Sequence, residues 1–304
     1  MKNILFAASE CVPFVKTGGL ADVVGALPKS LDKDKYDVRV VIPDYTSIPQ
    51  KYRSRFSYLD SFYMDLGELG NFYVGIMTCE FDGIRYYYID NEHFFQGERL
   101  YSDILWDIQK FSFFSKAVLS MLPVIGFRPD IIHCHDWQTA LIPVFLHEMF
   151  QNNPFFRGIR TIMTVHNLKF QGVWDIQTMR RFTGLPGHVF TLGRMEFHRD
   201  ANMLKGGLVY ADRITTVSNT YANEIRMPYY GEGLDGLLNA RSDSLWGIVN
   251  GIDYDLYNPA TDKMIAENYD ETTFEEGKKA CKLAIQRELG MPEDPDVMMI
   301  AMIT

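Results

Sequence analysis

The fold is decided by residues 3–22, which read NILFAASECVPFVKTGGLAD. Its first part, Asn3–Ala8, is an apolar run typical of a buried strand, and the pattern after the glycines predicts a helix over 21–31. A strand, a glycine-containing loop and a helix together bring backbone amides and a helix N-terminus to an anionic ligand. Gly18 and Gly19 let the main chain approach closely because neither has a Cβ atom. Lys16 adds a positive charge, so the stretch predicts a site for a phosphorylated sugar donor.

Short apolar strands alternate with helical patterns over most of the chain. We expect strands at 37–43, 72–81, 84–89, 130–134, 161–165 and 213–217, and a long helix at 107–122. Asp82-Gly83 predicts a hairpin between the second and third of these strands. The alternation predicts an α/β fold with a doubly wound, mostly parallel sheet.

Polar residues follow several of these strands at their carboxyl ends. They are Lys16–Asp22, His133–Trp137, His166-Asn167 and Ser218-Asn219. Ligands of doubly wound sheets bind at that edge, so we expect these segments to line one site.

The domain organisation is predicted from changes in pattern along the chain. Residues 1–245 form one domain, residues 246–295 a linker and a charged helix that stops at Gly290, and residues 296–304 an apolar strand. A buried strand needs neighbours on both faces. We therefore expect 296–304 to be the first strand of a second α/β domain that is truncated here.

Composition narrows the class of protein. The 304 residues carry a formal net charge of −9, which gives no reason to expect a nucleic-acid partner. Four cysteines lie far apart, no apolar run reaches about 18 residues, and the N-terminus lacks the pattern of a signal peptide. These features predict a cytoplasmic protein without a membrane partner.

Three short motifs have a structural alternative to their functional interpretation. The run 231–236, GEGLDG, matches GxGxxG, but Arg226–Tyr230 before it cannot be the buried strand of a dinucleotide fold, which favours a loop. Asp253-Tyr254-Asp255 resembles a metal-binding DxD, yet its linker-like position favours a turn. In His133–Asp136 only the two histidines point to one side of the strand, and zinc needs at least three ligands. We expect a strand end there, with Asp136 capping the next helix, and no metal.

Two further segments are candidates for the site. His166 directly follows a buried strand and shares its sheet edge with the Lys16 loop, so it is a candidate catalytic residue. Lys205-Gly206-Gly207 either packs a helix closely or lines the cleft, and both alternatives stay open.

Taken together, the sequence resembles the bacterial glycogen synthase and plant starch synthase family. The matching segments occur in family order: Lys16–Asp22, His133–Trp137, Thr164–Leu168, Phe170–Gly172, Asn202–Gly207, Thr216–Ser218, 231–236 and Asn250–Asp253. The resemblance implies a GT-B fold, in which two Rossmann-like domains face each other across a cleft. It also implies transfer of glucose from ADP-glucose to the non-reducing end of an α-1,4-glucan, with retention of configuration, no cofactor and no catalytic metal.

The resemblance further implies roles for individual residues. Lys16, Gly18, Gly19 and Asp22 would bind the donor, and His166 and Asp136 would be the catalytic pair. Asn167, Trp137, Lys205 and Gly206 would line the cleft. An arginine, a lysine and a glutamate of the family lie in the second domain, so the chain is expected to be incomplete as an enzyme. Two alternatives remain: a non-catalytic α-glucan-binding module, or a GT-B glucosyltransferase that uses UDP-glucose.

Overall fold

A computed structural model describes residues 1–97 and 99–302. The chain divides into two compact units, Met1–Gly251 and a second that begins at Ile252. In chain order, the helices and strands of the first unit are β1 (Lys2–Ala7), α1 (Gly19–Ser30), β2 (Tyr36–Pro43), α2 (Gln50–Arg53), β3 (Ser57–Asp65), β4 (Asn71–Phe81), β5 (Ile84–Asp90), α3 (Glu92–Phe95), α4 (Ile104–Val124), β6 (Ile131–His135), α5 (Leu141–Phe145), β7 (Arg160–Val165), β8 (Val173–Asp175), α6 (Ile176–Thr183), β9 (Glu196–Phe197), β10 (Asp200–Asn202), α7 (Met203–Tyr210), β11 (Arg213–Thr216), α8 (Asn219–Glu224), α9 (Asp235–Ala240) and β12 (Leu245–Gly247).

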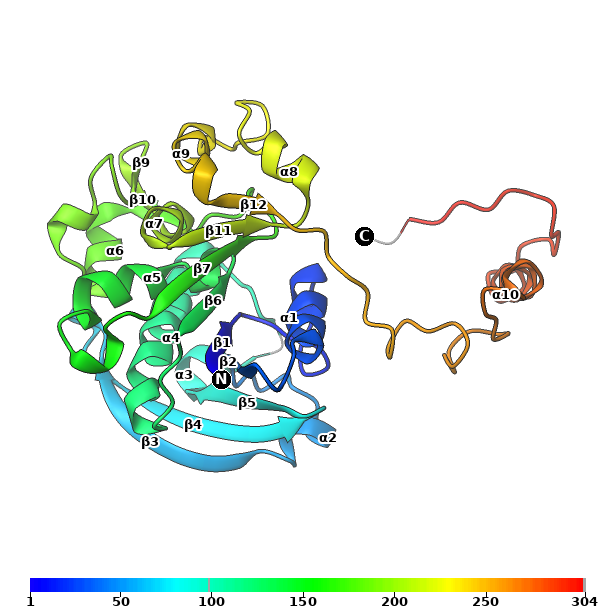
Figure 1. Cartoon of the computed structure of the whole chain (residues 1–304), viewed down its shortest axis with the longest axis horizontal. Helices are drawn as coiled ribbons and strands as arrows, with labels where there is room; N and C mark the ends of the chain where they lie inside the picture. The colour runs from blue at the N-terminus through cyan, green and yellow to red at the C-terminus, as the bar shows by residue number, and fades with distance from the viewer. Residues whose placement is uncertain (98, 303–304) are drawn as a thin grey trace. The chain divides into compact units, whose positions relative to one another are not determined.

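The first unit is built on a sheet of nine strands among the described residues, in the order β12-β11-β7-β6-β1-β2-β5-β4-β3. Pairing is parallel from β12 to β5 and antiparallel at β5-β4 and β4-β3. Helices α4, α5 and α7 lie on one side of the sheet, and α1 and α8 lie on the other (Figure 1). The predicted doubly wound, mostly parallel sheet is confirmed.

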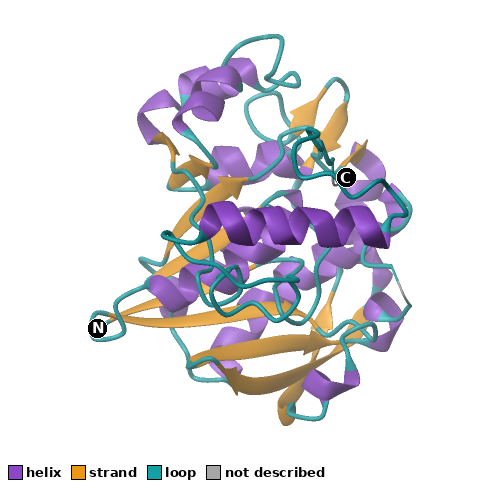
Figure 2. Ribbon diagram, turned by 90° about the vertical axis from the view of Figure 1, so that its right-hand side faces the viewer, coloured by secondary structure: helices purple, strands orange, loops and turns teal. Residues whose placement is uncertain are grey.

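The turn between β4 and β5 is the predicted hairpin. Asp82 and Gly83 both have positive φ, 50° and 71°, as a two-residue turn that matches strand twist requires. Strand β3 and the small antiparallel sheet β8-β10-β9 were not expected. Strand β3 is mostly exposed, so it lacks the apolar alternation that marks a half-buried strand. Figure 2 shows the long β3 and β4 strands at one end of the unit and the three short strands at the other.

The segment between β1 and α1 is anchored in the core before it reaches the predicted donor loop. Phe14 is buried and packs edge-on against Tyr86, with ring centroids 4.9 Å apart. Helix α1 lies so close to this segment that Gly25 has no room for a side chain: a Cβ there would lie 2.3 Å from Cγ2 of Val12. The loop that carries Lys16 is thus fixed at both ends.

The second unit contains α10 (Phe274–Glu288), which ends before Gly290 at φ +67°, as its sequence predicted. The expected strand at 296–304 is absent over its described part: residues 297–302 form no strand, and Ile300 and Met302 are each 85% exposed. A strand requires a neighbour to satisfy its backbone groups, and residues 297–302 pair with none. Residues 303 and 304 lie outside the described residues. Within 1–97 and 99–302, no helix is long and apolar enough to cross a lipid bilayer.

Candidate active site

A buried glutamate holds the loop that precedes α1. Glu10, three residues beyond the end of β1, accepts hydrogen bonds from the backbone N–H of Thr17 and from its hydroxyl, the latter at 2.9 Å. Burial raises the pKa of Glu10, and the bonds from Thr17 oppose that rise. The Tyr101 hydroxyl lies 2.9 Å from Oγ of Ser9 and 3.5 Å from the Glu10 carboxylate. Glu10 therefore fixes the predicted donor loop, a role that no sequence motif indicated.

The predicted donor residues lie together at the start of α1. Lys16 Nζ is 2.7 Å from Asp22 in a partly exposed ion pair, so the lysine charge is matched in this structure by a carboxylate in the first helical turn. Gly18 is extended, and a Cβ there would meet its nearest atom, Glu10 Oε1, at 4.0 Å; a Cβ on Gly19 would meet nothing within 4 Å. The open space beside these amides leaves room for a ligand at the helix N-terminus.

Asp136 and His166 join the ends of two adjacent strands. Asp136 Oδ1 accepts the backbone N–H of His166 at 2.7 Å, and the Asp136 N–H donates to Thr164 O at 2.9 Å. Asp136 was expected to cap the next helix, but its side chain makes no such bond, because its carboxylate accepts the N–H of His166, the residue after β7. Burial raises the pKa of Asp136 to about 7, against the lowering effect of backbone N–H groups from His166 and Asn167. The site thus holds a carboxyl group that can be neutral or ionised near neutral pH.

Three histidines stack in a column behind this carboxylate. The ring centroids of His133 and His135 are 4.3 Å apart, and those of His135 and His166 are 5.3 Å apart. Burial lowers the pKa of His133 to about 3 and that of His166 to about 4, and it lowers the pKa of His135 well below its ordinary value. No group of three or more His, Cys, Asp or Glu in the described parts of the chain is arranged to hold a metal ion. The column is therefore a set of neutral rings that hydrogen-bond and stack.

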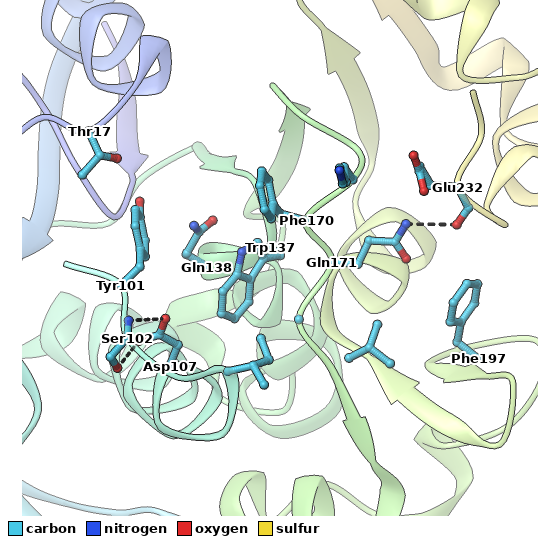
Figure 3. Close-up of a pocket in the computed structure, with 14 residues that line it drawn as sticks. Thr17, Tyr101, Ser102, Asp107, Trp137, Gln138, Phe170, Gln171, Phe197 and Glu232 are labelled. Atoms are coloured by element: carbon cyan, nitrogen blue, oxygen red, sulfur yellow. Dashed lines mark hydrogen bonds between the residues drawn. The ribbon is translucent and has the colours of Figure 1, made fainter. Parts of the chain in front are cut away.

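A pocket of about 740 Å³ is lined by residues from the segments that follow Asp136 and His166, although neither of these two residues lines it. Figure 3 shows its aromatic and polar side chains around one hollow. They come from six segments: Thr17; Tyr101, Ser102, Ile104 and Asp107; Trp137 and Gln138; Lys169, Phe170, Gln171, Gly172 and Val173; Phe197; and Glu232. Aromatic faces and a few polar groups in a concave site are suited to a small polar ligand with apolar ring faces.

Trp137 forms the floor of this pocket, and Gly172 lies directly against it. The indole is 5% exposed, and a Cβ on Gly172 would lie 2.4 Å from its Cε3 atom. Gly172 has φ +65°, a conformation that favours glycine. The predicted Phe170–Gly172 motif thus requires its glycine for two separate reasons, and Trp137 lines the pocket as expected.

The glycine run at 231–236 forms part of the pocket rim. The carbonyl of Glu232 accepts Nε2 of Gln171 at 3.1 Å, and Gln171 is bonded in turn by Asn202. Gly233 has φ +79°, and α9 begins at Asp235. No strand lies over 226–230, in agreement with the loop interpretation.

The remaining candidates lie just after β7 and on α7. Asn167 follows His166, and its side-chain oxygen accepts the Lys169 N–H at 3.0 Å. Lys205 Nζ donates to the Leu192 carbonyl at 2.8 Å, so it holds the loop before β9. A Cβ on Gly206 would lie 2.7 Å from Cγ of Met195. Gly206 is thus closely packed, and neither Lys205 nor Gly206 lines the pocket of about 740 Å³; their role at a cleft stays a prediction.

Sequence reasoning also missed the segment that carries Tyr101. A buried ion pair on α4 supports it: Lys110 Nζ lies 2.6 Å from Asp107 Oδ1, and Asp107 accepts the Ser102 N–H at 3.0 Å. The signal was present, since Asp107 and Lys110 are charged residues on an otherwise apolar helix. Asp107 and Lys110 lie one helical turn apart. This spacing gave no reason to connect them with the end of β1, about a hundred residues earlier in the chain.

The comparisons with known proteins agree on one family. The family model for the starch synthase catalytic domain matches residues 3–240. The chain is 58% identical over 304 residues to a glycogen synthase of Lachnospira eligens and 46% identical over 302 residues to one of Desulforamulus reducens. These alignments cover 100% and 99% of the chain but 63% and 62% of the relatives, so the chain spans less than two thirds of their length.

A solved structure is similar over nearly the whole chain. It is the catalytic domain of starch synthase IV from Arabidopsis thaliana bound to ADP and acarbose, with a TM-score of 0.85 and 31% sequence identity. The match covers 95% of this chain and 59% of the plant chain.

Proposed function

The chain belongs to the starch synthase catalytic domain family, and from that premise we propose that it forms the glucan-facing part of a glycogen synthase. The proposed reaction transfers glucose from ADP-glucose to the non-reducing end of an α-1,4-glucan with retention of configuration. The bond between the anomeric carbon and the phosphate oxygen breaks, and its electron pair leaves with ADP. A bond from the acceptor hydroxyl oxygen to the same carbon forms, and the hydroxyl proton is lost.

One observation supports this proposal above the others. The Lys16 loop, Asp136 and His166 follow β1, β6 and β7, which are consecutive neighbours in the parallel sheet. The segments that carry them therefore leave the sheet at the same carboxyl edge, where doubly wound folds bind their ligands. The 2.7 Å bond from His166 N to Asp136 Oδ1 fixes two of the three relative to each other.

The donor would lie across the start of α1. Its diphosphate develops negative charge as the sugar leaves, and the amides of Gly18 and Gly19 with the helix N-terminus supply fixed positive potential there. Lys16 would exchange its bond with Asp22 for one with phosphate, which leaves Asp22 able to accept a hydrogen bond from the sugar. This arrangement needs no metal, and we include metal-independent transfer in the proposal.

His166 and Asp136 would act at the transferred glucose. His166 is neutral near pH 7 because burial lowers its pKa to about 4, so it would hydrogen-bond the sugar without adding a charge that opposes the positive charge at the anomeric carbon. Asp136 would shape the wall on the acceptor side, and the aromatic pocket around Trp137 and Phe170 would take the end of the glucan chain. Four free thiols, of which Cys11, Cys79 and Cys134 are buried, support a cytoplasmic location.

The test is glucose incorporation into glycogen by the complete protein that carries this chain, with labelled ADP-glucose and labelled UDP-glucose in parallel. We expect ADP-glucose to be the better donor and His166→Ala to lower kcat about 100-fold or more. Equal rates with UDP-glucose would remove the donor assignment. Glycogen binding without any transfer would instead support the binding-module alternative.

A further inference from the structure

The His135 ring is buried between two other rings and is bonded on one side only. Its Nδ1 lies 2.9 Å from Nε2 of His166, while its Nε2 is buried without any hydrogen-bond partner in the described structure. The backbone of His135 is fixed by Thr139, whose hydroxyl oxygen accepts the His135 N–H at 2.7 Å. The backbone bond to Thr139 and the ring contact with His166 both orient this ring.

The 2.9 Å contact between the two rings holds one proton, which can be placed in two ways. If His166 donates from Nε2, then His135 must carry its own proton on Nε2, where it is buried without an acceptor. If His135 donates from Nδ1, its Nε2 is a bare lone pair and His166 carries its proton on Nδ1. A buried donor without an acceptor costs about 1–3 kcal/mol, and such N–H groups are rarer in proteins than under-used acceptors. The second arrangement is therefore favoured.

We propose that His135 is a positioning residue, which donates from Nδ1 to Nε2 of His166 and thereby fixes the His166 proton on Nδ1. That proton is aimed away from the column, and Nδ1 of His166 has no hydrogen-bond partner among residues 1–97 and 99–302. His166 then presents an N–H donor to a sugar hydroxyl. This role rests on the proposed function, since it specifies how His166 meets the transferred glucose.

His166 is held at two points. Asp136 fixes its backbone N–H at 2.7 Å, and His135 fixes its ring at 2.9 Å. A residue held at its backbone and at one ring nitrogen keeps its donor in place before the substrate arrives, and a misplacement of about 1 Å at such a site can cost about 100-fold in rate.

The direct test is the tautomer of His166, measured by long-range ¹H–¹⁵N correlation on the full chain labelled at its seven histidines. We expect the protonated nitrogen to be Nδ1 in both His135 and His166, with a coupling across the hydrogen bond that joins them. A proton on Nε2 of His166 overturns the proposal.

Two phenylalanine variants separate positioning from packing. His135→Phe keeps a ring in the column but removes the donor, and His133→Phe removes an imidazole from the same column that does not touch His166. We expect His135→Phe to shift the His166 nitrogen signals toward an average of the two tautomers, while His133→Phe leaves them unchanged. Unchanged His166 signals in His135→Phe contradict the proposal. His135→Asn, whose amide can donate from nearly the same place, is expected to restore the wild-type pattern.

Kinetics of the complete protein form a second, separate readout. We expect His135→Phe to lower kcat roughly 10- to 100-fold with little change in KM for the glucan, His135→Asn to recover most of it, and His133→Phe to stay within about twofold of the wild type. Absence of transfer by the wild type would end the proposed function, yet the tautomer measurement would still decide this inference. Normal transfer with the proton on Nε2 would end this inference alone.

Discussion

Asp136 and His166 lie 30 residues apart, and the carboxylate of the first accepts the backbone N–H of the second at 2.7 Å. The bond crosses from the end of β6 to the end of β7, and Asp136 adopts φ +55° to make it. A non-glycine residue in this conformation is strained, so the fold keeps the carboxyl group in place at a cost to backbone energy. The strain lies at the edge where the proposed chemistry occurs.

Replacing Asp136 tests that bond. Asp136→Ala removes the acceptor of a buried N–H, which costs about 1–3 kcal/mol; the alanine must adopt the same backbone angles, φ 55° and ψ −174°, that Asp136 already has. We expect the free energy of unfolding to fall by about 1–3 kcal/mol at pH 6 in urea denaturation. Asp136→Asn keeps an acceptor and tolerates positive φ, so it should lose less than half as much. Equal losses in the two variants would contradict the assignment.

The pH dependence of stability reports the buried carboxyl group itself. The pKa of Asp136 is about 7 in the folded chain and near its ordinary value of 3.8 when unfolded. Between these values the folded state holds a proton that the unfolded state has released, so rising pH favours unfolding by up to about 1.4 kcal/mol per pH unit. Asp136→Asn lacks this titration. Its free energy of unfolding, measured relative to that of the wild type, should therefore rise by about 3 kcal/mol between pH 5 and pH 8. Parallel stability curves for the two proteins would show that Asp136 does not titrate in this range.

The buried histidines predict the opposite slope. The pKa of His133 falls to about 3, so below pH 6.5 the unfolded chain binds a proton that the folded chain rejects. The stability that the neutral ring contributes is complete above pH 6.5 and is lost as pH falls, by about 2 kcal/mol between pH 6.5 and pH 5. His133→Phe should remove that share of the acid sensitivity. Identical slopes for the variant and the wild type would contradict the low pKa.

The parallel strands of the sheet could be predicted from the sequence because they are buried on both faces. Strand β1 carries the apolar run Ile4–Ala7 and strand β2 the run Val40–Ile42, and polar residues follow soon after each strand ends. Strand β3 was not predicted because its side chains are mostly exposed and do not alternate between apolar and polar residues. The small β8-β10-β9 sheet escaped because strands of two or three residues are too short to carry a pattern.

The candidate site was predictable only where a motif lies on one strand end. Lys16, Asp136 and His166 were proposed in this way, and the segments that carry them follow the neighbouring strands β1, β6 and β7. Glu10 and Tyr101 were missed because their interaction joins positions 91 residues apart, and neither residue belongs to a recognisable spacing. The bond from His135 to His166 required both ring orientations, which a strand pattern does not provide.

The contact between Gly172 and Trp137 gives a further prediction. Gly172→Ala adds a Cβ that would lie 2.4 Å from the indole and places alanine at φ +65°. Gly126→Ala is a matched control, because Gly126 has φ +62° and open space around it. Both variants carry the conformational cost of about 1–2 kcal/mol, but only Gly172→Ala must displace Trp137. We expect it to lose about 1–3 kcal/mol more stability than the control, to change the tryptophan fluorescence and to weaken glucan binding. Matching losses in both variants would mean that Trp137 adjusts freely.

The last prediction separates a structural from a functional role of Lys16. Its ion pair with Asp22 is partly exposed, with side chains 42% and 32% accessible, and such pairs contribute about 0–1 kcal/mol. Lys35 and Asp32 form a similar exposed pair at 2.8 Å, so Lys35→Gln is the control for Lys16→Gln. We expect urea denaturation to place both variants within about 0.5 kcal/mol of the wild type. Only Lys16→Gln should lower kcat/KM for ADP-glucose, by roughly 100-fold, because it alone removes a charge from the proposed diphosphate site. Comparable kinetics for the two variants in the glycogen-elongation assay would show that Lys16 does not meet the donor.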